Sequence, residues 1–584
     1  MKKFLLLLLI LFAAVQLNAQ WVSNVNINTI ITDTTGDKAV PKIAPATDGG
    51  CYISWFDNRG GSYAVYLQRL DANGVRQFPM HGLLISSNPQ SSSLVDWDMT
   101  VDAGNNAILA FTDTRNGSSI NPFAYKISPA GTFLWGANGV TLTDSSAVYQ
   151  ANPKVAATTD GNYVFCWIYA STPRKIAMQK LNSSGVPQWG SVPVKLSGSG
   201  SENLDWPALI KSDSGSVIML WSGYTGSFMN PQNYKLYTQK FSPANTRLWT
   251  NPQDTVYNLG RVNGFYTPRL FTDGVNGALY CWRDDRNSLN IQGAYAQRFN
   301  SAGIRQFQMN GAVCSDLTNF HHFDPVGTYV PSTGETYVFW SDANSGQTQV
   351  GGLNGQRFNS TGVPQWTTSG KTFKAIDNNQ FNSLNVLAKD TNVIVSFNET
   401  QYGSNNNIEK IMKTGPSGVF HWTGNILVAS NITGSKSRLG MVTRQSDGMG
   451  ILAWQESRNG VNIFAQNVNF NGTFGPPTGI IGTGSTAPEK FSLSQNYPNP
   501  FNPSTKIKFK IPSSEGYGFS RGVGLVTLKV FDITGREVRT LINESLNPGT
   551  YEVTFDGSNL NSGVYFYKIQ AGEFLQTKKL IILK

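Results

Sequence analysis

The stretch "SWFDNRGG", residues 54–61, places an acid and a base, Asp57 and Arg59, just after an aromatic residue, Trp55, and just before two glycines. Related stretches recur as "AFTDTRNG" (110–117), "CWRDDRNS" (281–288), "FWSDANSG" (339–346) and "AWQESRNG" (453–460). The aromatic residue that opens the element recurs every 54 to 61 residues, at Trp55, Phe111, Trp167, Trp221, Trp282, Trp340, Phe397 and Trp454. So regular a period predicts eight copies of one structural unit.

Each copy has the pattern of four short strands. The first strand begins near a proline, as in "PKIAPA" from Pro41, where a missing N–H group costs no ladder hydrogen bond. The second is almost entirely apolar, as in "YISWF" from Tyr52, which indicates burial on both faces. A third strand, a tight turn and a fourth strand follow. The sequence therefore predicts an all-β fold, an eight-bladed β-propeller with four-stranded blades of about 57 residues.

The eighth copy has no convincing fourth strand before the sequence changes to "PPTGIIGTGSTAPE" at 476–489. The stretch "QWVSNVNINTI" from Gln20 resembles "QWGSVPVKLSG" from Gln188, which is a predicted fourth strand. We expect the N-terminal strand to complete the last blade and so remove an open sheet edge. Seven blades with one degenerate copy are the alternative.

The first 19 residues combine two lysines, an apolar run and a small residue, Ala19, which predicts a cleaved signal peptide. No later run approaches the roughly 18 apolar residues of a membrane-spanning helix. The net charge of +10 is dispersed, so the sequence gives no indication of nucleic-acid binding. The four cysteines have no metal-site spacing. Three of them lie in apolar, strand-like runs, where we expect buried thiols, and the sequence leaves their pairing open. We expect no metal, no cofactor and a monomer.

The sequence pattern changes again near Phe491. Short alternating strands over residues 491–584 predict a small β-sandwich, residues 20–475 form the repeat domain, and residues 476–490 are the expected linker. Several motifs stand out in the last segment: "NYPNPFNPST" (496–505), "FDITGREV" (531–538), "SGVYFYKIQAG" (562–572) and the terminal "KKLIILK" (578–584).

Together these motifs resemble the C-terminal sorting domain of the type IX secretion system, an Ig-like sandwich related to the Ig-like domain of the flagellar hook-capping protein. The resemblance implies export to the outside of a Gram-negative cell, with the secretion machinery as partner. Its site residues are those that carry the sorting motifs: Asn496, Tyr497, Pro498, Asn499, Pro500, Phe501, Asn502, Pro503, Asp532, Gly535, Arg536, Gly563, Tyr565, Gly572, Lys578 and Lys579.

The recurrent acids and arginines favour a structural role. A catalytic propeller needs unequal residues around its channel, because a reaction uses one acid, one base and one substrate pose. An acid at a strand end instead accepts hydrogen bonds from a turn and pairs with a neighbouring guanidinium. We therefore expect blade-stabilising roles for Trp55, Asp57, Arg59, Asp113, Arg115, Trp167, Trp221, Trp282, Trp340 and Trp454.

Function is expected where copies depart from the pattern. Copy 5 has an extra acid, and "HHFD" at 321–324 opens copy 6; adjacent histidines on a strand point to opposite faces, which argues against a shared metal. Our leading hypothesis is an exported binding module for a glycan or protein, with Tyr224, Phe228, Tyr234 and Tyr237 as candidate contacts. The alternatives are a polysaccharide-acting hydrolase or lyase using Asp284, Asp285 and Asp324, and a structural surface protein.

Overall fold

The computed structural model describes residues 21–88, 95–117, 119–144, 147–250, 254–259, 267–288, 291–475, 481–484, 488, 490–512, 524–546, 549–558 and 560–584. The predicted signal peptide, residues 1–19, lies outside the described residues. The regular elements of the described ranges are all β-strands. These ranges contain no helix long and apolar enough to cross a membrane. The chain divides into two compact units, residues 1–475 and 476–584, which we describe separately.

The strands of the first unit form eight four-stranded antiparallel sheets, numbered here in chain order. Sheets 1 to 4 are β2 (Lys38–Pro45), β3 (Cys51–Asp57), β4 (Ala64–Leu70) and β5 (Leu83–Ser86); β6 (Asp98–Val101), β7 (Ala107–Asp113), β8 (Asn121–Ile127) and β9 (Val140–Thr141); β10 (Gln150–Ala157), β11 (Tyr163–Tyr169), β12 (Lys175–Leu181) and β13 (Val194–Leu196); and β14 (Asn203–Lys211), β15 (Val217–Ser227), β16 (Asn230–Phe241) and β17 (Asp254–Tyr257).

Sheets 5 to 8 continue the same pattern. They are β18 (Arg269–Thr272), β19 (Ala278–Ser288), β20 (Ile291–Phe299) and β21 (Ala312–Val313); β22 (Phe320–Val330), β23 (Glu335–Asn344), β24 (Gln347–Phe358) and β25 (Lys371–Asp377); β26 (Asn379–Lys389), β27 (Asn392–Gln401), β28 (Asn407–Thr414) and β29 (Ile426–Ser430); and β30 (Lys436–Thr443), β31 (Gly450–Ser457), β32 (Val461–Val468) and β1 (Thr29–Thr32).

Sheet 8 takes its fourth strand from the beginning of the chain. β1 pairs antiparallel with β32, with Thr29 opposite Ala465 and Ile30 opposite Phe464. The predicted participation of the N-terminal segment in the last sheet is therefore observed. Each sheet is open, since its first and last strands do not pair with each other.

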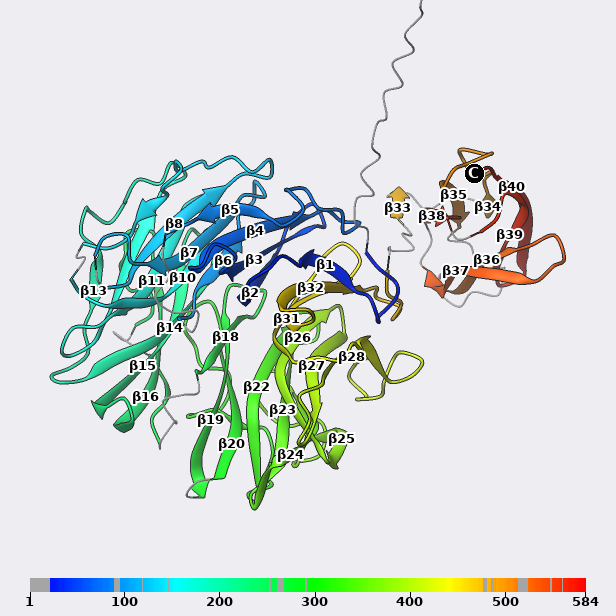
Figure 1. Ribbon diagram of the computed structural model, residues 1–584. Helices are drawn as coiled ribbons and strands as arrows, with labels where there is room; N and C mark the ends of the chain where they lie inside the picture. The colour runs from blue at the N-terminus through cyan, green and yellow to red at the C-terminus, as the bar shows by residue number, and fades with distance from the viewer. Residues whose placement is uncertain are drawn as a thin grey trace, which may run out of the picture. The chain divides into compact units, whose positions relative to one another are not determined.

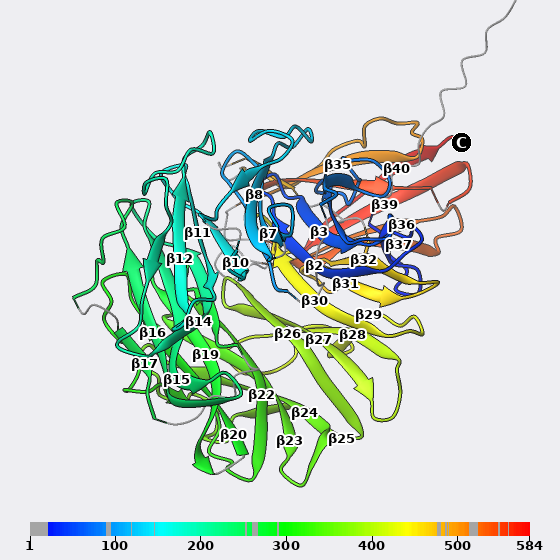
Figure 2. The same ribbon diagram turned by 60° about the vertical axis from the view of Figure 1, so that its left-hand side comes forward.

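The first strands of the sheets lie side by side. Each packs against the first strand of the next sheet, from β2 through β6, β10, β14, β18, β22 and β26 to β30, and β30 packs against β2 (Figures 1 and 2). The second strands lie behind them and are buried on both faces; every residue of β3 and β7 is buried. Apolar side chains of neighbouring sheets fill the space between them, as where Tyr52 and Phe56 of sheet 1 pack with Trp97 and Leu109 beside sheet 2.

The second unit contains two further four-stranded sheets. One orders β33 (Ile481–Gly484), β38 (Gly549–Asp556), β35 (Ser504–Ile511) and β34 (Ser492–Leu493), and the other orders β37 (Glu537–Leu546), β36 (Gly524–Phe531), β39 (Gly563–Ala571) and β40 (Phe574–Ile582). Burial alternates strictly along β35, and its inward side chains share one core with those of β36 and β39. This is the two-layer arrangement that the alternating pattern predicts.

Part of the expected linker is a strand. Ile481 and Gly482 pair with Glu552 and Tyr551 of β38, so β33 extends a sheet of the second unit. The segment is rich in Gly and Thr and shows no alternation of apolar residues. Backbone pairing along a sheet edge needs no side-chain pattern, which explains why no strand is predicted there.

Candidate functional site

The acid at the end of the second strand is held by the tryptophan two residues before it. The indole Nε1 of Trp55 donates a hydrogen bond to Asp57 at 3.1 Å, that of Trp282 to Asp284 at 2.9 Å, and that of Trp454 to Glu456 at 2.8 Å. Strand geometry explains the pairing, because side chains at positions i and i+2 lie on the same face. These tryptophans and acids are almost completely buried.

An arginine two residues further on completes the unit. In sheets 1, 2, 5 and 8 its guanidinium pairs with the acid and lies over an aromatic ring of the third strand, with 3.7 to 4.1 Å between guanidinium carbon and ring centre; the stacked pairs are Arg59–Tyr66, Arg115–Phe123, Arg286–Tyr295 and Arg458–Phe464. We call this arrangement the acid–arginine clasp. It neutralises a buried carboxylate with a charge-assisted hydrogen bond and a cation–π contact.

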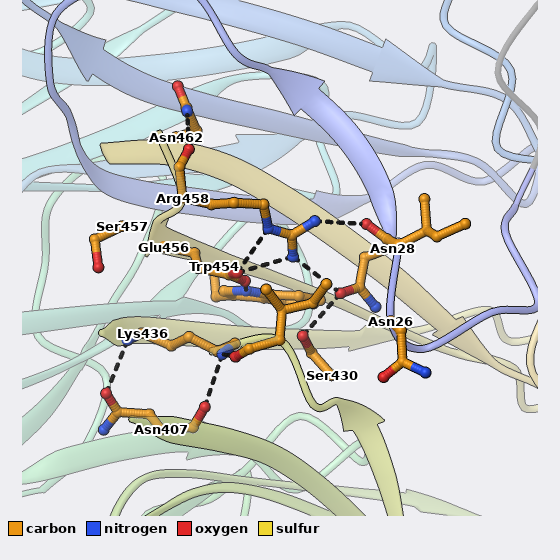
Figure 3. Close-up of polar contacts among 12 residues, drawn as sticks. Asn26, Asn28, Asn407, Ser430, Lys436, Trp454, Glu456, Ser457, Arg458 and Asn462 are labelled. Carbon is orange, nitrogen blue, oxygen red and sulfur yellow. Dashed lines mark hydrogen bonds and ion pairs between the residues drawn. The ribbon is translucent and has the colours of Figure 1, made fainter. Parts of the chain in front are cut away.

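The clasp also fixes the approach to the fourth strand. Its arginine donates to a backbone carbonyl two residues before that strand: His81 at 3.2 Å, Asn138 at 2.7 Å and Asn310 at 2.8 Å in sheets 1, 2 and 5. In sheet 8 the acceptor is Ile27, at 2.8 Å from Arg458, in the N-terminal segment (Figure 3). In the other three sheets the accepting carbonyl lies in the loop between the third and fourth strands. In sheet 8 the carbonyl of Ile27, just before β1, is the acceptor instead.

Asn28 reinforces this junction between the ends of the repeat region. It adopts a positive φ of 59°, where sheets 1, 2 and 5 have Gly82, Gly139 and Gly311. Asparagine tolerates this left-handed conformation better than most residues. Its amide donates to the Ala429 carbonyl at 2.9 Å and its carbonyl oxygen accepts from the Ser430 hydroxyl at 2.7 Å (Figure 3).

Other sheets hold the same position differently. In sheet 6 no arginine follows Asp342. Asn354 of the third strand and Trp340 donate hydrogen bonds to it, and Nδ1 of His322 on the first strand forms a hydrogen bond with it. In sheet 3 the Trp167 indole donates instead to Gln150 at 2.7 Å. Sheets 3 and 6 thus depart from the clasp, and the structural roles proposed for the repeated acids and arginines fit these contacts.

The three candidate catalytic carboxylates have different surroundings. Asp284 is buried in the clasp of sheet 5, bonded to Trp282 and Arg286. Asp285 is half-buried beside it and lines none of the cavities described below. Asp324 alone of the three lines cavities. The structure therefore does not bring the three acids together in one cavity.

Three cavities form a row along the first strands. One of about 250 Å³ lies between sheets 5, 6 and 7 and is lined by Arg283 and Asp324. A second, of about 130 Å³, shares these two residues and adds Arg269. A third, of about 380 Å³, shares Arg269 with the second and is lined by β2, β26 and β30, including Lys42 and Arg438. Shared lining residues make the three adjacent compartments of one candidate site.

A repeated bulge shapes this row. In six first strands the register shifts at a residue with φ between 49° and 58°: Val40, Asn152, Trp206, Asp324, Ser383 and Arg438. Four of them precede a proline, so Pro41, Pro153 and Pro207 lie at bulges inside their strands and not at strand starts, as the sequence had suggested. A bulge is another place where a strand tolerates proline, since one residue is left out of the ladder.

The charges along the row are mostly positive. Lys42 is paired, at 2.7 Å, with Asp96, which also binds Lys154, so one carboxylate joins sheets 1, 2 and 3. Burial opposes ionisation of Asp96, but the charges of Lys154 and Lys42 outweigh it and hold its pKa below the usual range. Burial raises the pKa of neighbouring Asp98, despite the same two lysines. Neither aspartate lines the three cavities.

The candidate aromatic contacts of sheet 4 are mostly core residues. Tyr224, Tyr234 and Tyr237 are 3 to 4% exposed, and the hydroxyls of Tyr224 and Tyr237 donate to Asp205 and Glu202. The expectation that these three contact a ligand is therefore wrong, because neighbouring groups already cover them. Phe228 is half-buried and packs against Trp206.

In the second unit, the motif at 496–505 ties the two ends of the sandwich together. Asn496 is buried and donates to the Pro498 carbonyl and the Thr505 hydroxyl. The Phe501 N–H donates to the Ile581 carbonyl of β40 at 3.0 Å, and Asn499 accepts from the Ile581 N–H at 2.9 Å. Tyr497 remains 81% exposed. The proline-rich segment thus contacts the final strand, β40, through hydrogen bonds of Asn499 and Phe501.

The remaining motif residues occupy turns and strand ends. Asp532 accepts hydrogen bonds from Thr534 and Arg536 in the hairpin between β36 and β37, where Gly535 has a φ of 81°. Gly572 has a φ of 59° between β39 and β40. Gly563 and Tyr565 begin β39, and Lys578 and Lys579 lie in β40.

Residues 495–583 match the family model described as "Secretion system C-terminal sorting domain". The second unit is a type IX secretion sorting domain. A type IX sorting domain interacts with the secretion machinery, and its presence places the protein on the cell surface or in the extracellular space of a Gram-negative bacterium. The motif residues on which the resemblance was based include those that form the turns of this sorting domain.

No curated protein matches the chain significantly. Among solved structures, the polysaccharide lyase Uly1 has a TM-score of 0.38 at 8% identity, covering 76% of this chain and 92% of its own. The α-L-arabinanase of Penicillium chrysogenum, complexed with arabinobiose, has a TM-score of 0.29 at 12% identity, covering 54% and 92%. The endo-arabinase of Bacteroides thetaiotaomicron has a TM-score of 0.26 at 15% identity, covering 46% and 96%. Such low scores carry no argument about function.

Within the described residues, no three His, Cys, Asp or Glu side chains converge as a metal site would require. All four cysteines are buried and unpaired, as expected for small apolar side chains. Burial raises the pKa of the Cys51, Cys166 and Cys281 thiols, which disfavours their reactive thiolate form.

Proposed function

We propose that the protein is an exported, monomeric binding module whose eight sheets are the blades of an eight-bladed propeller, completed by β1. The packing of first strands from β2 round to β30 and back to β2 supports this arrangement. The ligand, a glycan or a protein segment, occupies the row of cavities along those strands. Pockets at the centre of a repeat assembly are the usual places for such ligands.

One observation favours binding over catalysis: the repeated carboxylates are already paired. The clasp neutralises them in sheets 1, 2, 5 and 8, and His322 and Asn354 engage Asp342 in sheet 6. The only carboxylates that line the three cavities are Asp324 and Asp342. Since Asp342 is engaged, the described site lacks the second carboxylate that general acid–base hydrolysis of a glycoside requires.

A second candidate function is a polysaccharide-acting hydrolase or lyase. The observation in its favour is Asp324, which holds a φ of 50° and lines two cavities beside Arg283. Strained backbone at a cavity is a reason to test a residue for function.

Glycan-array binding and polysaccharide turnover, measured on the same full-length protein, separate the two candidates. The binding proposal expects retention of one class of glycan with no release of reducing ends or unsaturated products. The control is Asp324→Asn, which keeps the size of the side chain but cannot act as a base. Turnover by the wild-type protein that disappears in Asp324→Asn would replace the binding proposal with the enzymatic one.

A further inference from the structure

Two arginines in the row of cavities differ from the arginines of the clasps. Arg269 lines both the middle and the largest cavity, and Arg438 lines the largest. Within the described parts of the chain, neither has a hydrogen-bond or ion-pair partner, whereas every clasp arginine is bound to a carboxylate. Guanidinium groups offer several donors in a fixed plane that matches carboxylate or sulfate oxygens.

The two arginines come from distant parts of the repeat region. Arg269 begins β18 of sheet 5, and Arg438 lies on β30 of sheet 8, yet both line the cavity that also contains Lys42 of β2. In this cavity no lining residue is an acid. Since Lys42 is paired with Asp96, the two arginines are the positive charges of this cavity that have no partner among the described residues, and both can attract an anion there.

The backbone at Arg438 adds an independent observation. Its φ of 58° places it in the left-handed region at the bulge of β30. The left-handed conformation is strained for a residue with a side chain, so this geometry needs support from the surrounding structure. It puts an exposed arginine at a kink of a strand whose other residues largely follow the ladder.

Besides Arg283, Asp324, Asp342 and several apolar side chains, the row is lined by neutral polar side chains. Gln380 and Asn382 line the first cavity, and Ser383 and Asn385 line the largest. Amides and hydroxyls suit sugar hydroxyl groups, which both donate and accept hydrogen bonds. The carboxylate of Asp324, further along the row, also accepts from hydroxyls but repels a second anionic group close to it.

We infer that the row binds an acidic glycan, with a carboxylate or sulfate group of the sugar held by Arg269 and Arg438 and neutral hydroxyls held along Gln380 and Asn382. This inference rests on the proposed binding function and names its ligand class. An acidic peptide fits less well, because the neutral amides of β26 would face its apolar or charged side chains without a matching partner.

The test compares the binding of full-length protein to three soluble polymers: polygalacturonate, which carries carboxylates, dextran sulfate, which carries sulfates, and neutral dextran. The expected result is tight binding to one of the two anionic polymers and weak binding to dextran. Arg269→Gln and Arg438→Gln should each weaken the anionic binding about tenfold, the usual effect of losing one charge-assisted hydrogen bond.

Arg247→Gln is the matched control. Arg247 is exposed on the connection between β16 and β17 and lines none of the three cavities. The substitution therefore removes one positive charge outside the proposed site. Since Arg269 and Arg438 have no partner in the described structure, unchanged thermal unfolding of their variants would show that folding is intact.

Three outcomes would overturn the inference. If Arg269→Gln and Arg438→Gln bind no more weakly than Arg247→Gln, the anion is not held in these cavities. If neutral dextran binds as tightly as the anionic polymers, the ligand is a neutral glycan, and the proposed binding function stands without the inference. If none of the three polymers binds, the acidic-glycan inference is wrong; retention of another glycan class on the glycan array would then show that the binding function survives it.

Discussion

Sheets 1 and 7 each bury a carboxylate completely, Asp57 and Glu409, but they hold it in opposite ways. Burial pushes the pKa of Asp57 upward, but hydrogen bonds from Arg59 and Trp55 outweigh it, so the pKa falls below its usual range. Glu409 has no arginine beside it; burial raises its pKa to about 8, against the hydrogen bond from Asn398 and the charge of Lys436. The surroundings of Asp57 thus favour its charged form, and those of Glu409 favour its protonated form.

The difference shows what the clasp contributes. A buried charge is tolerated only when it is paired and hydrogen-bonded, and the clasp supplies both from residues that are neighbours in sequence. Sheet 7 lacks this unit, since Gln401 stands where sheet 1 has Arg59, and the acid at the end of its second strand, Glu399, pairs with Lys410 at 2.9 Å. One carboxylate oxygen of Glu409 there has no hydrogen-bond partner among the described residues, and protonation removes most of the cost.

Breaking a clasp should have the largest effect. Arg458→Met leaves Glu456 buried without its counter-charge and removes the hydrogen bond to Ile27 that ties the N-terminal segment to sheet 8. Removing one partner of a buried pair typically costs roughly 3–5 kcal/mol. The expected result is a marked fall in the thermal unfolding temperature. Near-ultraviolet circular dichroism measures that temperature.

Two further variants sharpen this prediction. Arg247→Met removes an exposed arginine and should change the unfolding temperature little. Adding Glu456→Gln to Arg458→Met removes the unpaired charge and should recover part of the lost stability. The clasp would be dismissed as a stabilising unit if Arg458→Met and Arg247→Met unfolded at the same temperature.

Sheet 7 should make stability depend on pH. The unfolded chain releases the proton of Glu409 above its ordinary pKa of 4.5, while the folded chain holds it until about pH 8. The contribution of Glu409 to the free energy of unfolding is therefore fully present below pH 4.5. It is lost as the pH rises toward 8, by at most about 1.4 kcal/mol per pH unit. Unfolding by urea at pH 5 and pH 8 measures this loss.

Glu409→Gln keeps a neutral side chain of the same shape and cannot titrate. Relative to the wild type, it should be more stable at pH 8 and about equally stable at pH 5. A wild-type protein and a Glu409→Gln variant with parallel stability profiles between these pH values would mean that Glu409 is charged in the folded protein, and the contrast with Asp57 would fail.

The sequence predicted the features of this architecture that follow from local pairing or from repetition, and missed those that depend on packing between sheets. The period of the motif, the pairing of Asp57 with Arg59 and the recruitment of the N-terminal strand all follow from residues close in sequence or from visible repetition. The bulge at Asp324 does not, because no residue pattern distinguishes a proline at a strand start from a proline at a bulge.

The candidate site shows the same limit. Arg269 and Arg438 are 169 positions apart and meet in one cavity only through the packing of the first strands. Conversely, the tyrosines around Tyr224 attracted attention as a cluster of aromatic residues, but antiparallel pairing of β15 with β16 turns them into a core. Clustering in sequence indicates proximity, and only tertiary packing decides which side of a sheet reaches a ligand.

The smallest effect distinguishes the indole groups of sheets 1 and 4. Trp55 and Trp221 are both completely buried, but Trp55 donates to Asp57 at 3.1 Å, whereas the Trp221 Nε1 has no partner among the described residues. Substitution by Phe removes similar volume at both sites, so the two losses of stability should differ by roughly 1.5–3 kcal/mol, the value of a hydrogen bond to a charged group. Urea unfolding of Trp55→Phe and Trp221→Phe at pH 7 measures the difference. Equal losses would mean that the indole hydrogen bond adds nothing to the clasp, and that Arg59 alone keeps Asp57 charged.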